Sequence, residues 1–468
     1  MLSYKNHSEK ISLIKESNLS LRENVAFFLK RIKDNSDLNA FNFVFEDCIE
    51  SADLIERKIK NGNAGKLAGM VIAIKDVLAI KDRPLTCSSN ILKDFHSLYT
   101  ATAIQKLIDE DAIIIGKTNC DEFAMGSSNE NSAFGAVKNP VDHSRVPGGS
   151  SGGSAVAVAA NLCDVSFGTD TGGSIRQPAA FCGIYGLKPT YGRVSRYGLT
   201  AFASSFDTIG PFAKNIYDIA LVLSVISGYD PKDSTSQNVD VPEFSSIRTS
   251  EKKFKIGLPK EYFAEGLNGE IKSAILKKVE SLKNAGHEII NIELPHTEYS
   301  IATYYILTTA EASSNLARFD GARYGYRSKE SSTLRNMYLN SRSEGFGSEV
   351  KRRIMLGTYV LSAGYYNAYY RKAQKVRRLL KQDFDNAFEK VDLILTPTTP
   401  TTAFKLGEKS NDPLEMYLED IYTTSANLVG IPGISIPIGR DKQGLPIGMQ
   451  IMANQFDENK LLTFCSDF

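Results

Sequence analysis

Two short stretches rich in glycine and serine could carry a hydroxyl nucleophile. Residues 147–154 read PGGSSGGS, and residues 171–174 read TGGS. Glycine permits tight turns and close approach of the backbone, and a strand ending at Phe167 would let N–H groups converge as an oxyanion hole requires. Taken alone, the first stretch would more often be a structural turn that caps a buried helix. No lysine follows these glycines, so a phosphate-binding loop is not expected.

A nucleophilic serine needs a base, and the histidines offer none in a recognisable hydrolase motif. There are five histidines, and only His143 lies close to either stretch in sequence. Lysine can replace histidine where burial or a nearby positive charge keeps the amine neutral. Lys75 directly follows residues 70–74 (MVIAI), which are typical of a buried strand. The alternative for Lys75 is a lysine at a strand end with its head in water.

The elements that would position these residues alternate between helical and strand patterns. Apolar residues recur at helical spacing in 21–32 and 103–108. Short apolar runs typical of buried strands lie at 112–115, 165–167 and 391–395. This alternation predicts an α/β fold in which helices cover both faces of a sheet.

Residues 253–390 differ from the rest of the chain in their pattern. They predict long charged and aromatic helices, above all at 348–389. Strand-like sequence returns from residue 391, so this helical lobe is expected to be inserted rather than appended. We expect one domain over residues 1–468, divided into N-terminal helices at about 1–65, a catalytic core at about 66–250 and 391–468, and a helical insertion at about 253–390.

Composition limits the classes of partner. The chain has 55 Lys and Arg against 54 Asp and Glu, so a polyanion is not expected to bind without help from another protein. The six cysteines occur singly, without the close pairs of zinc sites or disulfide frameworks. No run approaches the roughly 18 to 20 apolar residues of a membrane helix. We therefore expect a cytoplasmic protein with no membrane anchor and no metal site.

Three motifs together resemble the amidase signature family of Ser-Ser-Lys hydrolases. They are residues 71–76 (VIAIKD), 148–154 (GGSSGGS) and 170–178 (DTGGSIRQP). Their order and separations are also similar to those of the family. The resemblance implies the amidase signature fold, a central mixed twisted sheet with helices on both faces and an inserted helical lobe.

The resemblance also implies a catalytic triad. Ser174 would attack the amide carbonyl while Ser150 relays its proton to neutral Lys75. Ser150 would then return a proton to the leaving amine. The family holds the peptide bond before its bridging serine in the cis form, which here joins Gly149 to Ser150.

The loop around the nucleophile is implied to form the oxyanion hole. A single donor in such a hole is typically worth ~3 kcal/mol of barrier. Asp170 and Arg176 flank the loop and are expected to be a structural pair. The implied oxyanion donors are the N–H groups of Thr171, Gly172, Gly173 and Ser174.

Other segments resemble one branch of the family, the A subunits of bacterial-type glutamyl-tRNA and aspartyl-tRNA amidotransferases. These segments are residues 119–131, 311–321 and 349–358. The branch implies hydrolysis of glutamine through a glutamyl ester, with the ammonia used to convert Glu-tRNA(Gln) to Gln-tRNA(Gln) or Asp-tRNA(Asn) to Asn-tRNA(Asn). It implies a heterotrimer in which the B subunit binds the misacylated tRNA and uses ATP and Mg²⁺, and a small C subunit wraps around the A subunit. This chain itself would need no cofactor.

Glutamine carries an α-carboxylate and an α-ammonium, so its pocket should offer one cation and one anion. By position in the matching motifs, Arg353 would hold the carboxylate, because the guanidinium fork donates two parallel hydrogen bonds. Asp420 would hold the ammonium, and Tyr304 or Tyr305 would close the pocket. Without the resemblance, Arg353 would be interpreted as a solvated charge on a long helix.

Two other functions remain open from the sequence. A stand-alone amidase for small acyl or aryl amides would keep the triad and have no use for a buried charge pair. A catalytically silent scaffold would have lost at least one triad residue, and Lys75, Ser150 and Ser174 are all present.

Overall fold

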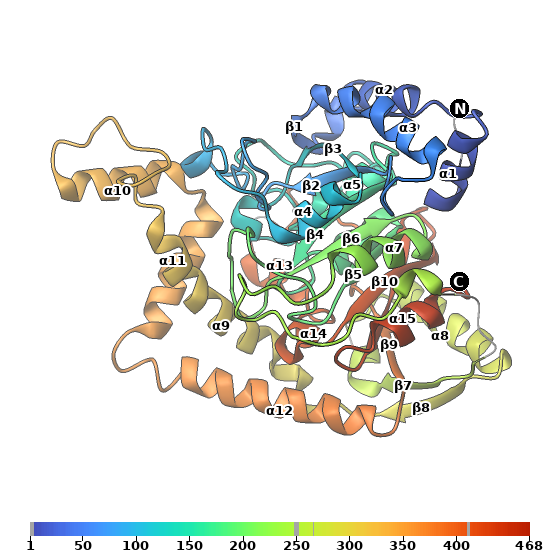
Figure 1. The fold of residues 1–468 in the computed structure, drawn as a ribbon. Helices are drawn as coiled ribbons and strands as arrows, with labels where there is room; N and C mark the ends of the chain where they lie inside the picture. The colour runs from blue at the N-terminus through green and yellow to red at the C-terminus, as the bar shows by residue number, and fades with distance from the viewer. Residues whose placement is uncertain (1–3, 248–251, 265, 410–411) are drawn as a thin grey trace.

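A mixed β-sheet of eleven strands runs through the centre of the molecule, with helices packed on both of its faces (Figure 1). The structure is a computed structural model that describes residues 4–247, 252–264, 266–409 and 412–468. The predicted fold class is confirmed. Across the sheet the strand order is β1-β3-β2-β4-β6-β5-β10-β11-β9-β7-β8.

The bounds of the strands are as follows: β1 (Phe41–Val44), β2 (Val71–Lys75), β3 (Ile113–Thr118), β4 (Val165–Asp170), β5 (Tyr185–Lys188), β6 (Thr208–Ala213), β7 (Lys255–Pro259), β8 (Glu288–Ile292), β9 (Leu393–Pro397), β10 (Gly433–Arg440) and β11 (Pro446–Ala453). Strand β2 pairs in parallel with β3 and with β4, and β7 pairs in parallel with β8 and β9. The remaining pairs are antiparallel.

The bounds of the helices are as follows: α1 (His7–Lys15), α2 (Leu21–Asp34), α3 (Ala52–Asn61), α4 (Thr102–Asp109), α5 (Gly152–Ala159), α6 (Arg176–Cys182), α7 (Ile216–Ile226), α8 (Gly269–Asn284), α9 (Ser300–Asn315), α10 (Leu334–Gly345), α11 (Ser348–Leu361), α12 (Tyr370–Phe388), α13 (Pro413–Leu418), α14 (Thr424–Val429) and α15 (Glu458–Cys465). Among the described residues, no helix has the length and apolar character needed to cross a membrane.

The apolar runs form strands where the sequence predicted them, and the strands extend past the carboxyl ends of the runs. The difference that matters for the site is at the end of β4. The run at 165–167 was expected to end at Phe167, whereas β4 continues to Asp170. The reason is tertiary, because β4 pairs with β6 up to the register Asp170↔Thr208. The nucleophile loop therefore begins directly at the end of the strand.

The prediction of a helical insertion at 253–390 is wrong for its first part. Strand β7, helix α8 and strand β8 lie there, and both strands join one edge of the central sheet (Figure 1). Strand β8 reads EIINI, and its isoleucines favour extended backbone. The long helices expected at 348–389 are present as α11 and α12, separated by a break in which Gly364 has a φ of +90°.

The sheet brings distant segments to one edge. Because β2 and β4 are parallel neighbours, their carboxyl ends lie together. Lys75 is the last residue of β2, and Asp170 is the last residue of β4. In open α/β sheets, ligands bind beyond the carboxyl ends of the strands, and the predicted catalytic residues meet at this edge.

Candidate active site

Lys75 is fully buried, and its amine lies among hydroxyl groups. The Nζ atom donates to Ser150 Oγ at 2.8 Å, to Ser151 Oγ at 2.8 Å and to Thr169 Oγ1 at 2.9 Å. Every residue of β2 is buried, so the strand delivers the amine into a site without bulk water. Burial lowers the pKa of Lys75 to about 8. A neutral amine able to accept a proton is therefore accessible near physiological pH.

The first glycine-serine stretch leads into helix α5 through tightly packed backbone. The peptide bond between Gly149 and Ser150 is cis, as the family resemblance implied. The N–H of Gly149 donates to Gln177 Oε1 at 2.9 Å. A Cβ atom at Gly149 would lie 2.2 Å from Asp121 Oδ2, so a side chain cannot be accommodated without movement of buried groups.

Ser174 lies in the loop between β4 and α6 and is the serine that a substrate can reach. It is 8% exposed, whereas Ser150 is completely buried. Among the described residues, the Ser174 hydroxyl makes no hydrogen bond, and none joins it to the Ser150 hydroxyl. The structure thus links Lys75 to Ser150 directly and leaves the Ser174 hydroxyl free.

The expected oxyanion donors are not equivalent. The N–H of Gly173 donates to Asp170 Oδ1 at 2.9 Å and is not free for a substrate, contrary to expectation. Within the described chain, the N–H groups of Thr171, Gly172 and Ser174 have no acceptor. These three N–H groups are available to a developing oxyanion.

Asp170 and Arg176 form a buried ion pair that holds the loop. Arg176 Nη2 donates to Asp170 Oδ1 at 2.9 Å, and both side chains are fully buried. Burial alone would raise the pKa of Asp170, but the Arg176 charge lowers it to about 2. The carboxylate also accepts the N–H of Ile175 at 3.1 Å. The structural pair expected from the sequence is present.

Neighbouring side chains clamp the same loop from two directions. A Cβ atom at Gly172 would lie 2.5 Å from the ring of Tyr304 on helix α9. At Gly173, where φ is +142°, it would lie 2.2 Å from Thr423 Oγ1. Thr423 also donates to the carbonyl of Gly172 at 2.6 Å. Only glycine fits these two positions.

Arg353 on helix α11 is buried and partly engaged. It is 3% exposed, and its Nε donates to Glu349 Oε1 at 2.8 Å. The guanidinium lies 5.3 Å from the ring centroid of Tyr305 and 5.6 Å from that of Tyr417. In the described part of the chain, its two Nη groups make no hydrogen bond. They are free to bind a carboxylate in the bidentate manner.

Asp420 presents one unpaired carboxylate oxygen. Its Oδ2 accepts a hydrogen bond from Ser127 Oγ at 2.5 Å. Its Oδ1 is buried and has no partner among the described residues. Burial raises the pKa of Asp420 to about 8, although Ser127 and Arg353 act in the opposite direction. A buried acceptor without a partner is costly, and an ammonium group would satisfy it.

The two candidate tyrosines have different neighbours. Tyr304 lies against Gly172 of the nucleophile loop. Tyr305 stacks on Tyr417 with ring centroids 3.8 Å apart, beside Arg353. Tyr304 and Tyr305, which are adjacent on α9, therefore connect the nucleophile loop to the guanidinium of Arg353.

Several side chains of the site were not predicted from the sequence. Glu349 stands four residues before Arg353, a helical spacing at which opposite charges meet, so this partner was detectable. Ser127 lies within residues 119–131, but nothing in that sequence indicated its hydrogen bond to Asp420. Thr169 and Ser151 contact Lys75 only because strands and loops far apart in sequence meet. His143, considered as a base, lies at the surface with its Nδ1 3.2 Å from Asp37.

Comparison with known proteins agrees with this geometry. A family model for amidases matches residues 23–462. The chain belongs to the amidase family. It is 59% identical to the A subunit of glutamyl-tRNA(Gln) amidotransferase from Koribacter versatilis over 440 residues, which cover 93% of this chain and 92% of that protein. The protein of the same name from Acidobacterium capsulatum is 62% identical, with 85% of this chain and 83% of that protein covered.

A solved structure gives the same assignment within the family. The crystal structure of the A subunit of glutamyl-tRNA(Gln) amidotransferase from Thermotoga maritima matches with a TM-score of 0.80 and 39% identity. The match covers 97% of this chain and 92% of that chain. Within the amidase family, the chain therefore belongs to the branch of these A subunits.

Proposed function

We propose that this chain hydrolyses glutamine and supplies the ammonia with which a tRNA-dependent amidotransferase converts Glu-tRNA(Gln) to Gln-tRNA(Gln). The observation that carries the proposal is the pair of buried charged side chains near the nucleophile loop. Among the described residues, the Nη groups of Arg353 and the Oδ1 of Asp420 have no hydrogen-bond partner. A small acyl or aryl amide would leave both groups unsatisfied at a cost. Glutamine offers the opposite charge to each.

Acylation begins at Ser174. Its oxygen attacks the side-chain amide carbon of glutamine, its proton passes to Ser150 Oγ, and the Ser150 proton passes to the neutral amine of Lys75. The negative charge on the carbonyl oxygen is stabilised by the N–H groups of Thr171, Gly172 and Ser174. When the C–N bond breaks, Lys75 returns a proton through Ser150 to the leaving nitrogen. Ammonia departs, and a glutamyl ester remains on Ser174.

Deacylation repeats these steps with water as the nucleophile. Water attacks the ester carbonyl and loses a proton through Ser150 to Lys75. The Ser174 oxygen then leaves and regains a proton by the same route, which releases glutamate. Both half-reactions need a neutral Lys75 at the start, and the burial of this lysine supports that requirement.

The substrate would bind with its two charged groups away from the reacting amide. The α-carboxylate accepts hydrogen bonds from the Nη groups of Arg353, and the α-ammonium donates to Asp420 Oδ1. Tyr304 and Tyr305 line the space between the charge pair and the loop. Binding of the ammonium favours the ionised form of Asp420, whose pKa burial raises to about 8.

The ammonia is used outside this chain. We propose a cytoplasmic heterotrimer in which a B subunit binds the misacylated tRNA and activates its side-chain carboxylate with ATP and Mg²⁺, and a C subunit packs on the A subunit. This proposal is supported by the relatives at 59% and 62% identity, which are A subunits of glutamyl-tRNA(Gln) amidotransferases. Amidation of Asp-tRNA(Asn) by the same complex is the related activity to measure.

The test is ammonia release from L-glutamine by the chain co-expressed with candidate B and C subunits. Ser174→Ala should lower kcat by at least about 1,000-fold, because the covalent route is lost. Arg353→Ala should raise the KM for glutamine by at least about tenfold. Retained activity in Ser174→Ala would exclude the mechanism. A wild-type enzyme that ignored glutamine and cleaved simple aryl amides would instead be a stand-alone amidase.

A further inference from the structure

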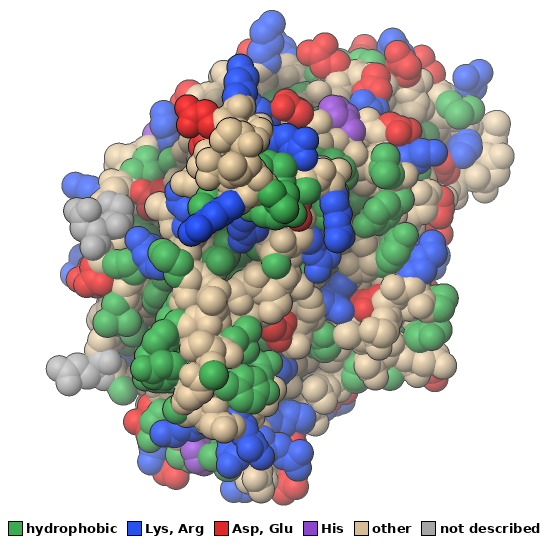
Figure 2. Space-filling view, turned by 90° about the vertical axis from the view of Figure 1, so that its left-hand side faces the viewer, with side chains coloured by type: hydrophobic (Ala, Val, Ile, Leu, Met, Phe, Trp, Pro, Cys, Tyr) green, Lys and Arg blue, Asp and Glu red, His purple; other side chains and the backbone are tan. Residues whose placement is uncertain are grey.

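Helix α12 carries a local concentration of positive charge that the overall composition conceals. The chain has 55 basic and 54 acidic residues, yet residues 371–381 contain six Lys or Arg and no Asp or Glu. Figure 2 shows Lys and Arg side chains gathered at the bottom of the molecule, at the level where α12 runs in Figure 1.

The charges have a defined orientation on the helix. Arg371, Lys375 and Arg378 stand at i, i+4 and i+7, so they share one face, and all three are exposed. The opposite face, with Leu380 and Phe384, is buried against the rest of the protein. Within the described chain, none of the three cations has an acidic partner. Their charge is therefore available to another molecule.

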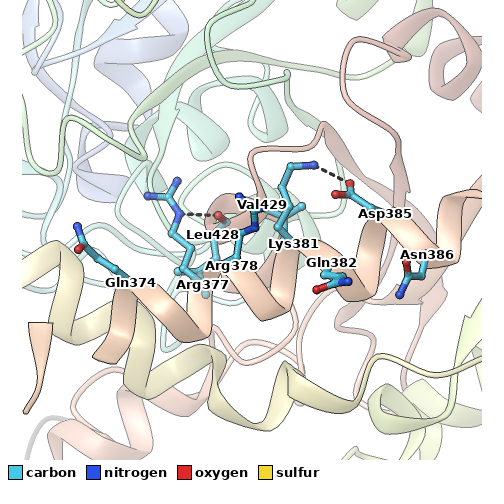
Figure 3. A pocket seen from close by; sticks show the side chains of 9 residues that line it. All are labelled: Gln374, Arg377, Arg378, Lys381, Gln382, Asp385, Asn386, Leu428 and Val429. Carbon is cyan, nitrogen blue, oxygen red and sulfur yellow. Dashed lines mark hydrogen bonds and ion pairs between the residues drawn. The ribbon is translucent and has the colours of Figure 1, made fainter. Parts of the chain in front are cut away.

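A cavity of about 640 Å³ lies beside this face, between α12 and the C-terminal end of α14 (Figure 3). Arg377 projects into it and is fixed, since its Nε donates to the carbonyl of Leu428 at 2.7 Å. Lys381 pairs with Asp385 at 2.6 Å. Three side-chain amides also line the cavity, those of Gln374, Gln382 and Asn386.

The chemistry of this surface fits phosphate and sugar better than protein. Guanidinium, ammonium and amide groups are the usual donors to phosphate oxygens in nucleic-acid complexes. The core of a protein interface is instead apolar and aromatic and contains little lysine. Only two of the residues lining the cavity are apolar, Leu428 and Val429.

We propose that the outward face of α12, formed by Arg371, Lys375 and Arg378 with the adjoining cavity, binds the sugar-phosphate backbone of the tRNA being amidated. The inference rests on the proposed function, since that reaction brings a tRNA to the complex. The face adds phosphate contacts to those made by the partner subunit. It carries no sequence specificity, because phosphates are the same at every nucleotide.

The test uses the assembled complex of this chain with its B and C subunits. The variant replaces Arg371, Lys375 and Arg378 together by glutamine. The control replaces Lys33, Lys277 and Lys283 by glutamine, three exposed lysines on other helices, so the net charge changes equally. The probe is fluorescently labelled, uncharged tRNA(Gln), titrated at several salt concentrations. Glutaminase activity without tRNA is measured in parallel.

The α12 variant should raise the Kd for tRNA by at least about tenfold at ~0.1 M salt. It should also lower the slope of log Kd against log salt by about one for each phosphate that is no longer bound. Glutaminase activity should stay at the wild-type level in both variants, because none of these side chains is in the site.

Two results would overturn the inference, and a third would distinguish its failure from a failure of the proposed function. A wild-type Kd and salt slope in the α12 variant would show that the face is merely solvated. Failure of this variant to assemble, with the control intact, would show that the face is a subunit interface. Absence of glutaminase activity in the wild-type complex would contradict the proposed function and leave the tRNA measurement valid as a test of the face.

Discussion

At the scale of single residues, each charged group of the proposed glutamine pocket is oriented by a second side chain. Glu349 Oε1 accepts from Arg353 Nε at 2.8 Å, and this bond restricts the orientation of the guanidinium. Ser127 donates to one oxygen of Asp420, and the other oxygen has no partner in the part of the chain that the structure describes. Both charged groups are therefore already oriented in the folded protein, so less conformational entropy is lost when the substrate binds.

We predict that Glu349→Gln raises the KM for glutamine about tenfold and changes kcat by less than about threefold. The amide keeps the size of the side chain but weakens the charge-assisted bond that orients Arg353. Glu280→Gln, an exposed site on α8, is the matched control. Steady-state ammonia assays on both variants give the two constants, and an unchanged KM in Glu349→Gln would show that Arg353 needs no such support.

The pKa values of the site predict how activity depends on pH. Lys75 must be neutral to act as base and Asp420 must be ionised to bind the ammonium, and both have a pKa of about 8. Each form is present above its pKa, so kcat/KM for glutamine should fall as pH decreases through 8. The slope of log kcat/KM against pH should approach about two well below that pH.

Glutaramate, which is glutamine without its amino group, separates the two titrations. It does not need ionised Asp420, so its slope should approach about one, set by Lys75 alone. Rates for both substrates between pH 6 and about 9 provide the comparison. Equal slopes for the two substrates would mean that Asp420 does not bind the ammonium.

At the scale of elements, the loop between β4 and α6 is shaped by what packs on it. Tyr304 of α9 lies against Gly172, and Thr423 hydrogen-bonds the Gly172 carbonyl at 2.6 Å. Helix α9 thus contacts the nucleophile loop through Tyr304 and the proposed glutamine pocket through Tyr305. A small displacement of this contact would misalign the oxyanion donors.

Gly172→Ala should therefore lower kcat by at least about tenfold, because the new Cβ atom would meet the Tyr304 ring at 2.5 Å. Gly269→Ala at the start of α8 is the control, since no atom lies within 4 Å of its added methyl group. Circular dichroism melting establishes that both variants fold. Normal kcat in Gly172→Ala would show that the loop can move without loss of donors.

At the scale of the whole molecule, the sheet interleaves strands from both halves of the chain. Strands β10 and β11 lie between β5 and β9. Arg176 reinforces this connection, because it binds Asp170 and also the side chains of Asn427 and Gln450. We propose that residues 1–468 form one domain, in which β7 and β8 belong to the sheet and the helical insertion starts with α9.

Arg176→Met should lower the free energy of unfolding by about 3–5 kcal/mol, since it leaves the buried Asp170 carboxylate uncompensated. Arg22→Met removes a pair whose side chains are 50% and 58% exposed, and its cost should be about 0–1 kcal/mol. Urea unfolding measures both. A single cooperative transition is expected, and two separated transitions would argue against one domain.

The sequence by itself determined the features that depend on neighbouring residues. The apolar runs specified β2, β3 and β9, and the glycines marked the two loops where side chains cannot fit. The family motifs predicted the triad. Helical spacing would also have sufficed to pair Glu349 with Arg353, although this pair was not predicted. These signals are local, so they could be read without knowing how the chain folds.

Only the tertiary structure decided the contacts made across the sheet and the burial that results from them. Hydroxyls of Ser151 and Thr169 surround Lys75, and β4 extends to Asp170 because β6 pairs with it. Asp170 also engages the N–H of Gly173, and one oxygen of Asp420 is left buried without a partner among the described residues. Such features arise when residues distant in sequence exclude water together, and no periodicity along the chain encodes them.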